Sequence, residues 1–144
     1  MTTDRLDVSA LRNAITALAD GIGVVRNDGW FALQSAAVRN TLVAGVIQNF
    51  EFVYELGVKM LKRQIEAEAA NPGEVDKFGF RDLLRVAAEK GLIADVDAWF
   101  GYCKMRGTTS HADDQEKARL VYQGALTFLD DARALLAALM ARNA

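Results

Sequence analysis

Proline is nearly absent from this chain: Pro72 is the only proline among 144 residues. Proline breaks helices because it lacks a backbone N–H and its ring collides with the preceding turn. Alanine and leucine are plentiful, whereas turn-forming dipeptides are few and widely spaced. The sequence therefore predicts an all-α protein in which long helices are joined by short connections.

The first half of the chain predicts two helices. The first has Ser9 as a candidate N-cap and shows apolar residues at helical spacing. Turn-forming residues at 27–29 precede a second apolar-periodic stretch over residues 31–70. One helix of that length would span about 60 Å, which is long for a small domain. The expected interruptions are a break near Asn40 or a bend at Gly45 or Gly57.

The middle of the chain predicts two short helices. Residues 71–73 end the long stretch, and residues 74–79 are expected to form a connection. A short helix from Phe80 should close with a left-handed glycine at Gly91. Asp95 is then placed to cap the next short helix.

The last part of the chain predicts a polar connection and one long helix. Residues 105–114 are small, polar and poorly helical. Asp113 and Glu116 match a capping box at the start of an amphipathic helix that runs to the C-terminus. Together, the elements predict a four-helix up-and-down bundle with short additional helices, in a single domain over residues 1–144.

Composition limits the chemistry that one chain can carry. A single histidine, His111, and a single cysteine, Cys103, cannot form a Cys/His metal cluster or an intrachain disulfide. The formal net charge of -2 gives no overall attraction for nucleic acid. Residues 1–7 do not resemble a secretory signal, and no apolar run is long enough to span a membrane. We therefore expect a cytoplasmic protein without metal, cofactor or membrane association.

Asp95 and Asp97 have two interpretations. Two aspartates on alternate residues of a strand hold magnesium in nucleotidyltransferases. Here they follow a glycine-terminated helix and open another one, without the sheet that such a site requires. We therefore assign them to helix capping and to neutralisation of the helix dipole.

By their residue types, Arg106 and His111 are the best candidates for catalytic groups. Histidine has an unperturbed pKa near neutrality, and arginine can bind a phosphate through two parallel hydrogen bonds. The pair would suffice for metal-independent cleavage of RNA. Their spacing alone favours a structural role, in which both residues tie a loop to a helix terminus, because an arginine and a histidine five residues apart occur by chance in many proteins.

Two separated motifs resemble a known family. Residues 50–62, FEFVYELGVKMLK, are similar to the "FEFxFELxWKxLK" helix of the nucleotidyltransferase substrate-binding family, a branch of the HEPN helical bundles. Residues 91–93, Trp99 and residues 106–111, RGTTSH, follow the same family's "GLI…W…RNxTSH" order. The resemblance covers about residues 45–130.

The resemblance implies a homodimeric helical bundle that pairs with a small, separately encoded nucleotidyltransferase in a two-gene, toxin–antitoxin-like system. It also implies that Arg106 holds a phosphate and that His111 is the acid–base group of a site that takes a nucleotide or RNA. The residues implied to line or support substrate binding are Phe50, Tyr54, Glu55, Lys59, Thr109 and Ser110.

Two positions depart from the family pattern. Gly107 replaces the usual asparagine, and Asp113 replaces the tyrosine that can accept a nucleotidyl group in the toxin branch. An aspartate at that position would place negative charge near an RNA phosphate. We therefore favour a substrate-binding or regulatory partner of a minimal nucleotidyltransferase. The alternatives are a metal-independent HEPN ribonuclease toxin that uses Arg106 and His111 across a dimer, and a structural helical adaptor.

Overall fold

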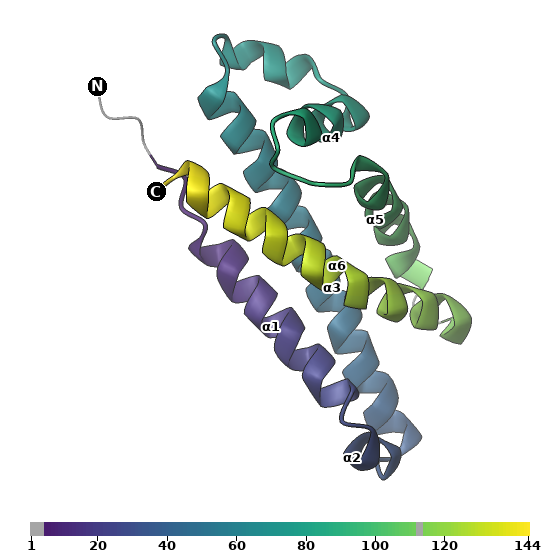
Figure 1. Cartoon of the computed structure of the whole chain (residues 1–144). Helices are drawn as coiled ribbons and strands as arrows, with labels where there is room; N and C mark the ends of the chain where they lie inside the picture. The colour runs from purple at the N-terminus through teal and green to yellow at the C-terminus, as the bar shows by residue number, and fades with distance from the viewer. Residues whose placement is uncertain (1–4, 112–113) are drawn as a thin grey trace.

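The computed structural model describes residues 5–111 and 114–144, and for His111 it describes the backbone alone. Successive principal helices reverse direction along the chain, so the predicted all-α bundle is confirmed (Figure 1). The elements are α1 (Ser9–Val25), α2 (Asp28–Ala32), α3 (Ala36–Glu68), the 3-10 helix η1 (Pro72–Lys77), α4 (Phe80–Glu89), α5 (Val96–Thr108), the 3-10 helix η2 (Thr109–His111) and α6 (Gln115–Arg142).

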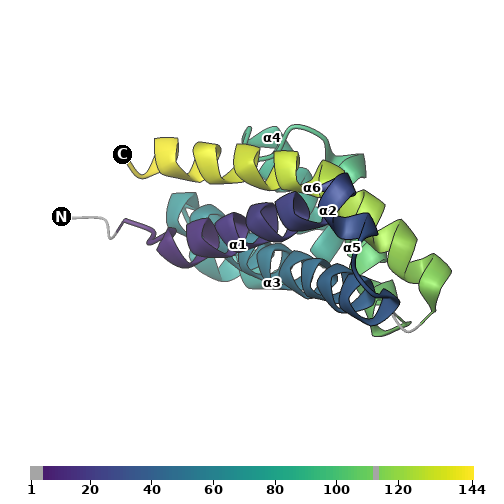
Figure 2. The same cartoon turned by 90° about the horizontal axis from the view of Figure 1, so that it is seen from below.

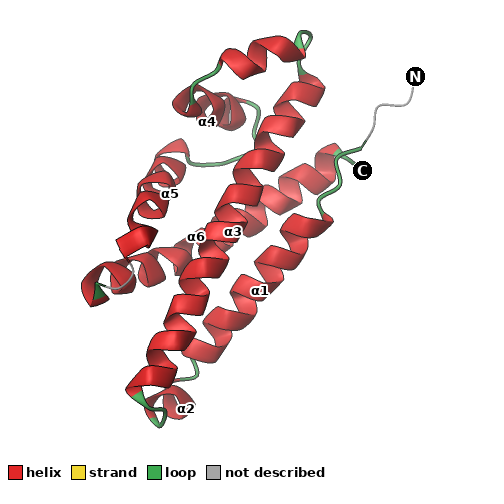
Figure 3. Cartoon of the chain, turned by 180° about the vertical axis from the view of Figure 1, so that it is seen from behind, coloured by secondary structure: helices red, strands yellow, loops and turns green. Residues whose placement is uncertain are grey.

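The helix α3 is the central element, and it contacts α1, α4, α5 and α6 (Figure 3). It begins after Ser35, whose hydroxyl accepts the Val38 N–H at 3.2 Å, and it is helical for 33 residues. The expected break near Asn40 is therefore wrong, because tertiary contacts along α3 support a helix longer than local signals suggest. Gly57 serves close packing: a Cβ built there would lie 3.3 Å from Leu135 of α6.

Two capping predictions are confirmed. The Asp95 carboxylate accepts the N–H groups of Asp97 and Ala98 at 3.0 and 3.2 Å. After α4, Gly91 has a φ of 76°, which a glycine adopts without steric cost. The Leu92 N–H then donates to the Ala87 carbonyl at 2.9 Å, as in a Schellman motif.

Two other cap assignments are wrong by one residue. Val8 occupies the N-cap of α1, and the carboxylate of Asp7 accepts the Ser9 N–H at 2.9 Å. At α6, the cap is Asp114, which accepts the N–H groups of Glu116 and Lys117. Asp113, the predicted cap, lies outside the described residues. Local sequence defines a helix end only to within one or two residues, so it leaves the position of a cap open.

The segment that was expected to be poorly helical is helical further than predicted. The helix α5 continues to Thr108, and η2 adds another turn. The hydroxyl of Thr108 donates to the Met105 carbonyl at 2.8 Å, and that of Thr109 donates to the Arg106 carbonyl at 2.8 Å. These bonds satisfy carbonyl groups at the helix end, where the α-helical ladder stops. The turn keeps Arg106 on a regular helix.

The core beside α5 is aromatic. The Phe128 ring packs edge-on against Phe50 and Tyr102, with centroids 4.9 Å apart in each case. Trp99 completes the contact from α5, with its ring centroid 5.7 Å from that of Phe128. Edge-to-face pairs at such distances add to the stabilisation that comes from burial. The aromatic core therefore fixes α5 against α3 and α6.

A polar network closes the opposite end of the bundle, and we call it the C-terminal clasp (Gln64, Glu68, Lys90, Arg142 and Asn143). Arg142 donates to the two carboxylate oxygens of Glu68 at 2.7 and 2.9 Å and to the Lys90 backbone carbonyl. Asn143 donates to the Gln64 side chain at 2.8 Å and accepts the Leu6 N–H at 2.9 Å. The clasp joins the ends of α3 and α6 to the start of the described chain.

None of the helices in the described parts of the chain combines the length and the apolar character that a membrane span requires.

Candidate functional site

Arg106, near the end of α5, is held by a carboxylate from the middle of α3. Its Nε and Nη2 atoms both donate to Glu55 Oε1, at 3.0 and 2.6 Å. Its Nη1 atom donates to the Thr109 hydroxyl at 3.0 Å. These bonds fix the plane of the guanidinium, while 36% of the Arg106 side chain stays exposed to solvent. The structure therefore brings Glu55, Arg106 and Thr109 together.

A second carboxylate also faces Arg106. Glu51 precedes Glu55 by one helical turn, and its Oε2 lies 3.9 Å from Arg106 Nη2. We call Glu51, Glu55, Arg106 and Thr109 the Arg106 cluster. The hydrogen bond with Glu55 raises the pKa of Arg106, and the charges of both glutamates act in the same direction. One guanidinium beside two carboxylates leaves the cluster with an excess of negative charge.

The residues that follow Arg106 differ in exposure. Thr109 is buried, and its hydroxyl accepts from the Arg106 side chain and donates to the Arg106 carbonyl. Ser110 is exposed. The side chain of His111 lies outside the described part of the structure, although its backbone ends η2 directly after these two residues. The predicted acid–base role of His111 therefore stays a prediction.

Two predicted binding residues are buried beneath this surface. Phe50 is fully buried against Phe128, so it supports the site from the core and does not reach solvent. Tyr54 is also buried, and burial together with the neighbouring Cys103 raises the pKa of its hydroxyl. Both residues therefore lie in the core on the inner face of α3, whereas Glu55, directly after Tyr54, is exposed.

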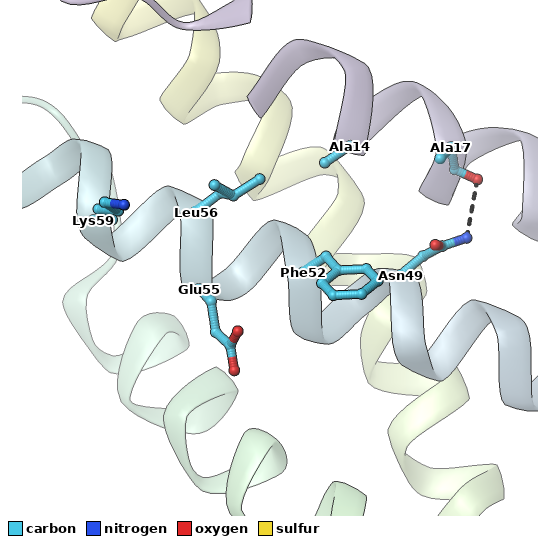
Figure 4. A pocket seen from close by; sticks show the side chains of 7 residues that line it. All are labelled: Ala14, Ala17, Asn49, Phe52, Glu55, Leu56 and Lys59. Carbon is cyan, nitrogen blue, oxygen red and sulfur yellow. Dashed lines mark hydrogen bonds between the residues drawn. The ribbon is translucent and has the colours of Figure 1, made fainter. Parts of the chain in front are cut away.

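Lys59 follows Glu55 by one turn of α3, whereas Glu51 precedes it by one turn. It is exposed and lines a hollow of about 430 Å³ between α1 and α3, together with Phe52 and Leu56. Figure 4 shows that the Glu55 carboxylate points away from Ala14 and Ala17 of α1, which form the far wall of this hollow. Glu55 lines the hollow and also binds Arg106, so the hollow and the Arg106 cluster share this residue.

This geometry can be compared with known proteins. Residues 6–141 match the family described as "Nucleotidyltransferase substrate binding protein like". The chain belongs to this family. The match spans α1 to α6 and includes every residue of the Arg106 cluster, as the motifs in residues 50–62 and 106–111 predicted.

Two of the matches come from Haemophilus influenzae. One, called "Probable ribonuclease HepT", is 43% identical over 143 residues, covering 99% of this chain and 98% of the relative. The other is a solved structure described as revealing the fold of a substrate-binding domain of a nucleotidyltransferase. It has a TM-score of 0.91 and 42% identity, and the alignment covers 93% of this chain and 99% of the other.

The departure from the family motif at Gly107 leaves open space. Gly107 lies in α5, exposed, and a Cβ built on it would meet no atom within 4 Å. The described residues therefore leave room for the Cβ of the asparagine that is usual in the family. The other departure, Asp113, lies outside the described residues.

Glu51 is a site residue that sequence reasoning missed. Its signal was its spacing of four residues from Glu55, which places both carboxylates on one face of α3. No group of three or more metal-binding side chains occurs among the residues that the structure describes. The described side chains of the cluster offer charges and hydrogen-bonding groups to a ligand.

Proposed function

We propose that this chain is the substrate-binding or regulatory subunit of a separately encoded minimal nucleotidyltransferase, in a two-gene system that resembles a toxin–antitoxin pair. The observation that carries the proposal is the family match over residues 6–141. In this role the chain acts as a homodimer. Glu55, Lys59 and Ser110 supply exposed polar groups of the binding surface, Thr109 orients Arg106, and Phe50 and Tyr54 support α3 from below.

The charge of the Arg106 cluster supports a binding role over cleavage of RNA. An RNA phosphate at Arg106 would approach Glu51 and Glu55, and it would compete with the hydrogen bonds that Glu55 already makes. Charge repulsion at such distances weakens phosphate binding even near a protein surface. A partner that supplies its own cations would not meet this obstacle.

The proposal predicts a gene for a minimal nucleotidyltransferase beside this one, and co-expression of the two proteins tests it. We expect the two proteins to elute together in size-exclusion chromatography, with a mass by light scattering that contains two copies of the 15.7 kDa chain. We also expect the chain to change the transferase's KM for nucleotide. Separate elution together with unchanged transferase kinetics would contradict the proposal.

A ribonuclease is the second candidate, because the relative called a probable ribonuclease is similar over nearly the whole chain. Purified protein should then cleave RNA in the presence of EDTA. His111→Ala should abolish cleavage with an unchanged helical circular dichroism spectrum, and Lys104→Ala, which alters an exposed cation elsewhere on α5, should retain it. Absence of cleavage by the dimer would remove this candidate.

The third candidate is a structural adaptor, and the bonds from Arg106 to Glu55 and Thr109 favour it. In that case Arg106→Ala would lower stability and leave both the transferase complex and its kinetics unchanged. Reduced complex formation by a folded Arg106→Ala variant would speak against a purely structural role.

A further inference from the structure

A second cleft lies between the first turns of α3 and α6, and it shares no lining residue with the Arg106 cluster. Its volume is about 720 Å³, compared with about 430 Å³ for the hollow beside Lys59. Figure 2 shows the starts of α3 and α6 at the same end of the bundle. Sites for small molecules usually measure about 300–1,000 Å³. The cleft therefore has the size of a small-molecule site.

Two arginines face this cleft from different helices. Arg39 of α3 is half-buried, and its Nη1 donates to the Gln34 carbonyl at 2.8 Å, which holds the guanidinium in place. Arg119 of α6 is more exposed, and its Nη2 lies 3.7 Å from Glu116 Oε1 in a solvent-accessible contact. Such exposed pairs are weak, so Arg119 can turn towards a ligand at little cost.

The charged side chains in the described wall of the cleft are all basic. Among the described residues that form its wall, none is an aspartate or a glutamate. This composition is the reverse of that in the Arg106 cluster, where two carboxylates face one arginine. Arginine is well suited to phosphate because its planar fork can form two parallel hydrogen bonds. The cleft therefore favours an anion more strongly than the Arg106 cluster does.

The other polar residues of the cleft can contact an aromatic, hydrogen-bonding part of a ligand. Tyr122 of α6 is half-buried in the wall, which offers an aromatic ring beside the two cations. Asn40 and Gln115 contribute side-chain amides from the two helices. Aromatic rings stack on nucleobases, and amides offer both the donors and the acceptors that a base edge presents.

We propose that the cleft between α3 and α6 binds a nucleotide, with Arg39 and Arg119 on its phosphates and Tyr122 against its base. The choice of a nucleotide over another aromatic phosphate rests on the proposed function, because a nucleotidyltransferase consumes nucleoside triphosphates. A cleft with two arginines on a chain of net charge -2 is too small a basic surface for a polynucleotide.

Calorimetric titration of the full chain with ATP tests this proposal. Arg39→Ala and Arg119→Ala should each weaken binding about tenfold, the loss expected for a hydrogen bond to a charged group. Arg133→Ala is the matched control, since it removes an exposed arginine of α6 outside the cleft, and it should leave the affinity unchanged. Tyr122→Leu should weaken ATP binding and leave the binding of inorganic tripolyphosphate unaffected.

Several outcomes would overturn the proposal. These are no binding of ATP to the wild-type chain, equal affinity in the Arg39→Ala/Arg119→Ala double variant with an unchanged circular dichroism spectrum, or binding of a short single-stranded RNA in place of ATP. Tripolyphosphate that binds as tightly as ATP would overturn the base contact.

The transferase complex is measured separately, on the same double variant. A double variant that forms the complex but no longer binds ATP supports the cleft and the proposed function together. A wild-type chain that binds ATP but forms no complex contradicts the proposed function and leaves the cleft supported.

Discussion

Arg142 and Arg106 each bind a glutamate of α3, but the charges around the two contacts differ. At the C-terminal clasp, Glu68 of α3 faces two cations, with Arg142 Nη1 at 2.7 Å and Lys90 Nζ at 3.6 Å. In the Arg106 cluster, one guanidinium faces both Glu51 and Glu55. The Glu68 side chain is 26% exposed, whereas that of Glu55 is 54% exposed.

The difference separates a structural contact from a candidate binding surface. In the clasp, Glu68 also accepts from Gln64 at 2.6 Å, so its carboxylate is bound by a neutral donor as well as by two cations. In the Arg106 cluster, Glu51 lies 3.9 Å from Arg106, beyond hydrogen-bond distance, and the contact between Arg106 and Glu55 is open to solvent. An arginine paired with glutamate therefore has different consequences depending on exposure and on which charge is in excess.

The clasp should contribute more to stability than the Arg106 cluster. Arg142→Ala removes bonds to Glu68 and to the Lys90 carbonyl, so we expect the free energy of unfolding to fall by about 2 kcal/mol. Urea denaturation followed by circular dichroism measures this change. Arg142→Lys keeps the charge but not the planar fork, and it should recover only part of the loss. An unchanged urea midpoint in Arg142→Ala would contradict a larger contribution of the clasp to stability.

The corresponding change in the Arg106 cluster should cost less. Arg106→Ala is expected to lower the free energy of unfolding by about 1 kcal/mol, because solvent screens its contact with Glu55. The same urea titration measures it. A loss greater than that of Arg142→Ala would mean that this cluster is the main structural contact.

The helix end that carries Arg106 can be strengthened. Gly107 lies in α5 with open space around its Cα, so Gly107→Ala should raise the free energy of unfolding by about 0.5 kcal/mol. Thermal denaturation checks the gain. Gly91→Ala is the opposing control, since Gly91 has a positive φ and should lose stability on substitution. A loss in Gly107→Ala would show that this position needs its glycine.

The smallest expected effect is a pH dependence at the clasp. Burial acts to raise the pKa of Glu68, but hydrogen bonds from Gln64 and Arg142 and the charges of Arg142 and Lys90 outweigh it and lower that pKa below 4.5. Glu68 therefore stabilises the fold above its unfolded pKa and loses this contribution as the pH falls through the folded value.

Stability measured by urea titration between neutral pH and acid tests this effect. The wild type should lose more stability on acidification than Glu68→Gln, which cannot titrate at that position. Equal slopes in the two proteins would contradict a lowered pKa for Glu68.

Local chemistry explains which structural predictions succeeded. Asp95 and Gly91 act within a few residues of their own positions, so their capping roles could be predicted from the sequence. The break near Asn40 was wrong because the continuity of α3 depends on other helices packed along it. The Ser9 cap was wrong because α1 begins one residue earlier, and Ser9 is its first helical residue, with its N–H donated to Asp7.

The same distinction applies to the sites. Resemblance to family motifs in residues 50–62 and 106–111 pointed to Glu55, Arg106 and Thr109, which the structure brings together. Nothing in the sequence pointed to the cleft of Arg39 and Arg119. These residues are far apart along the chain and lie in helices whose local patterns do not specify their neighbours.

The helical class, several helix ends and the family follow from the sequence, because helix periodicity, glycine caps and short motifs are encoded over a few residues. The contact of Glu55 with Arg106, the contact of Glu68 with Arg142 and the cleft that holds two arginines are visible only in the folded structure. Charge pairing depends on distances between side chains from different helices, and packing of the whole bundle sets those distances.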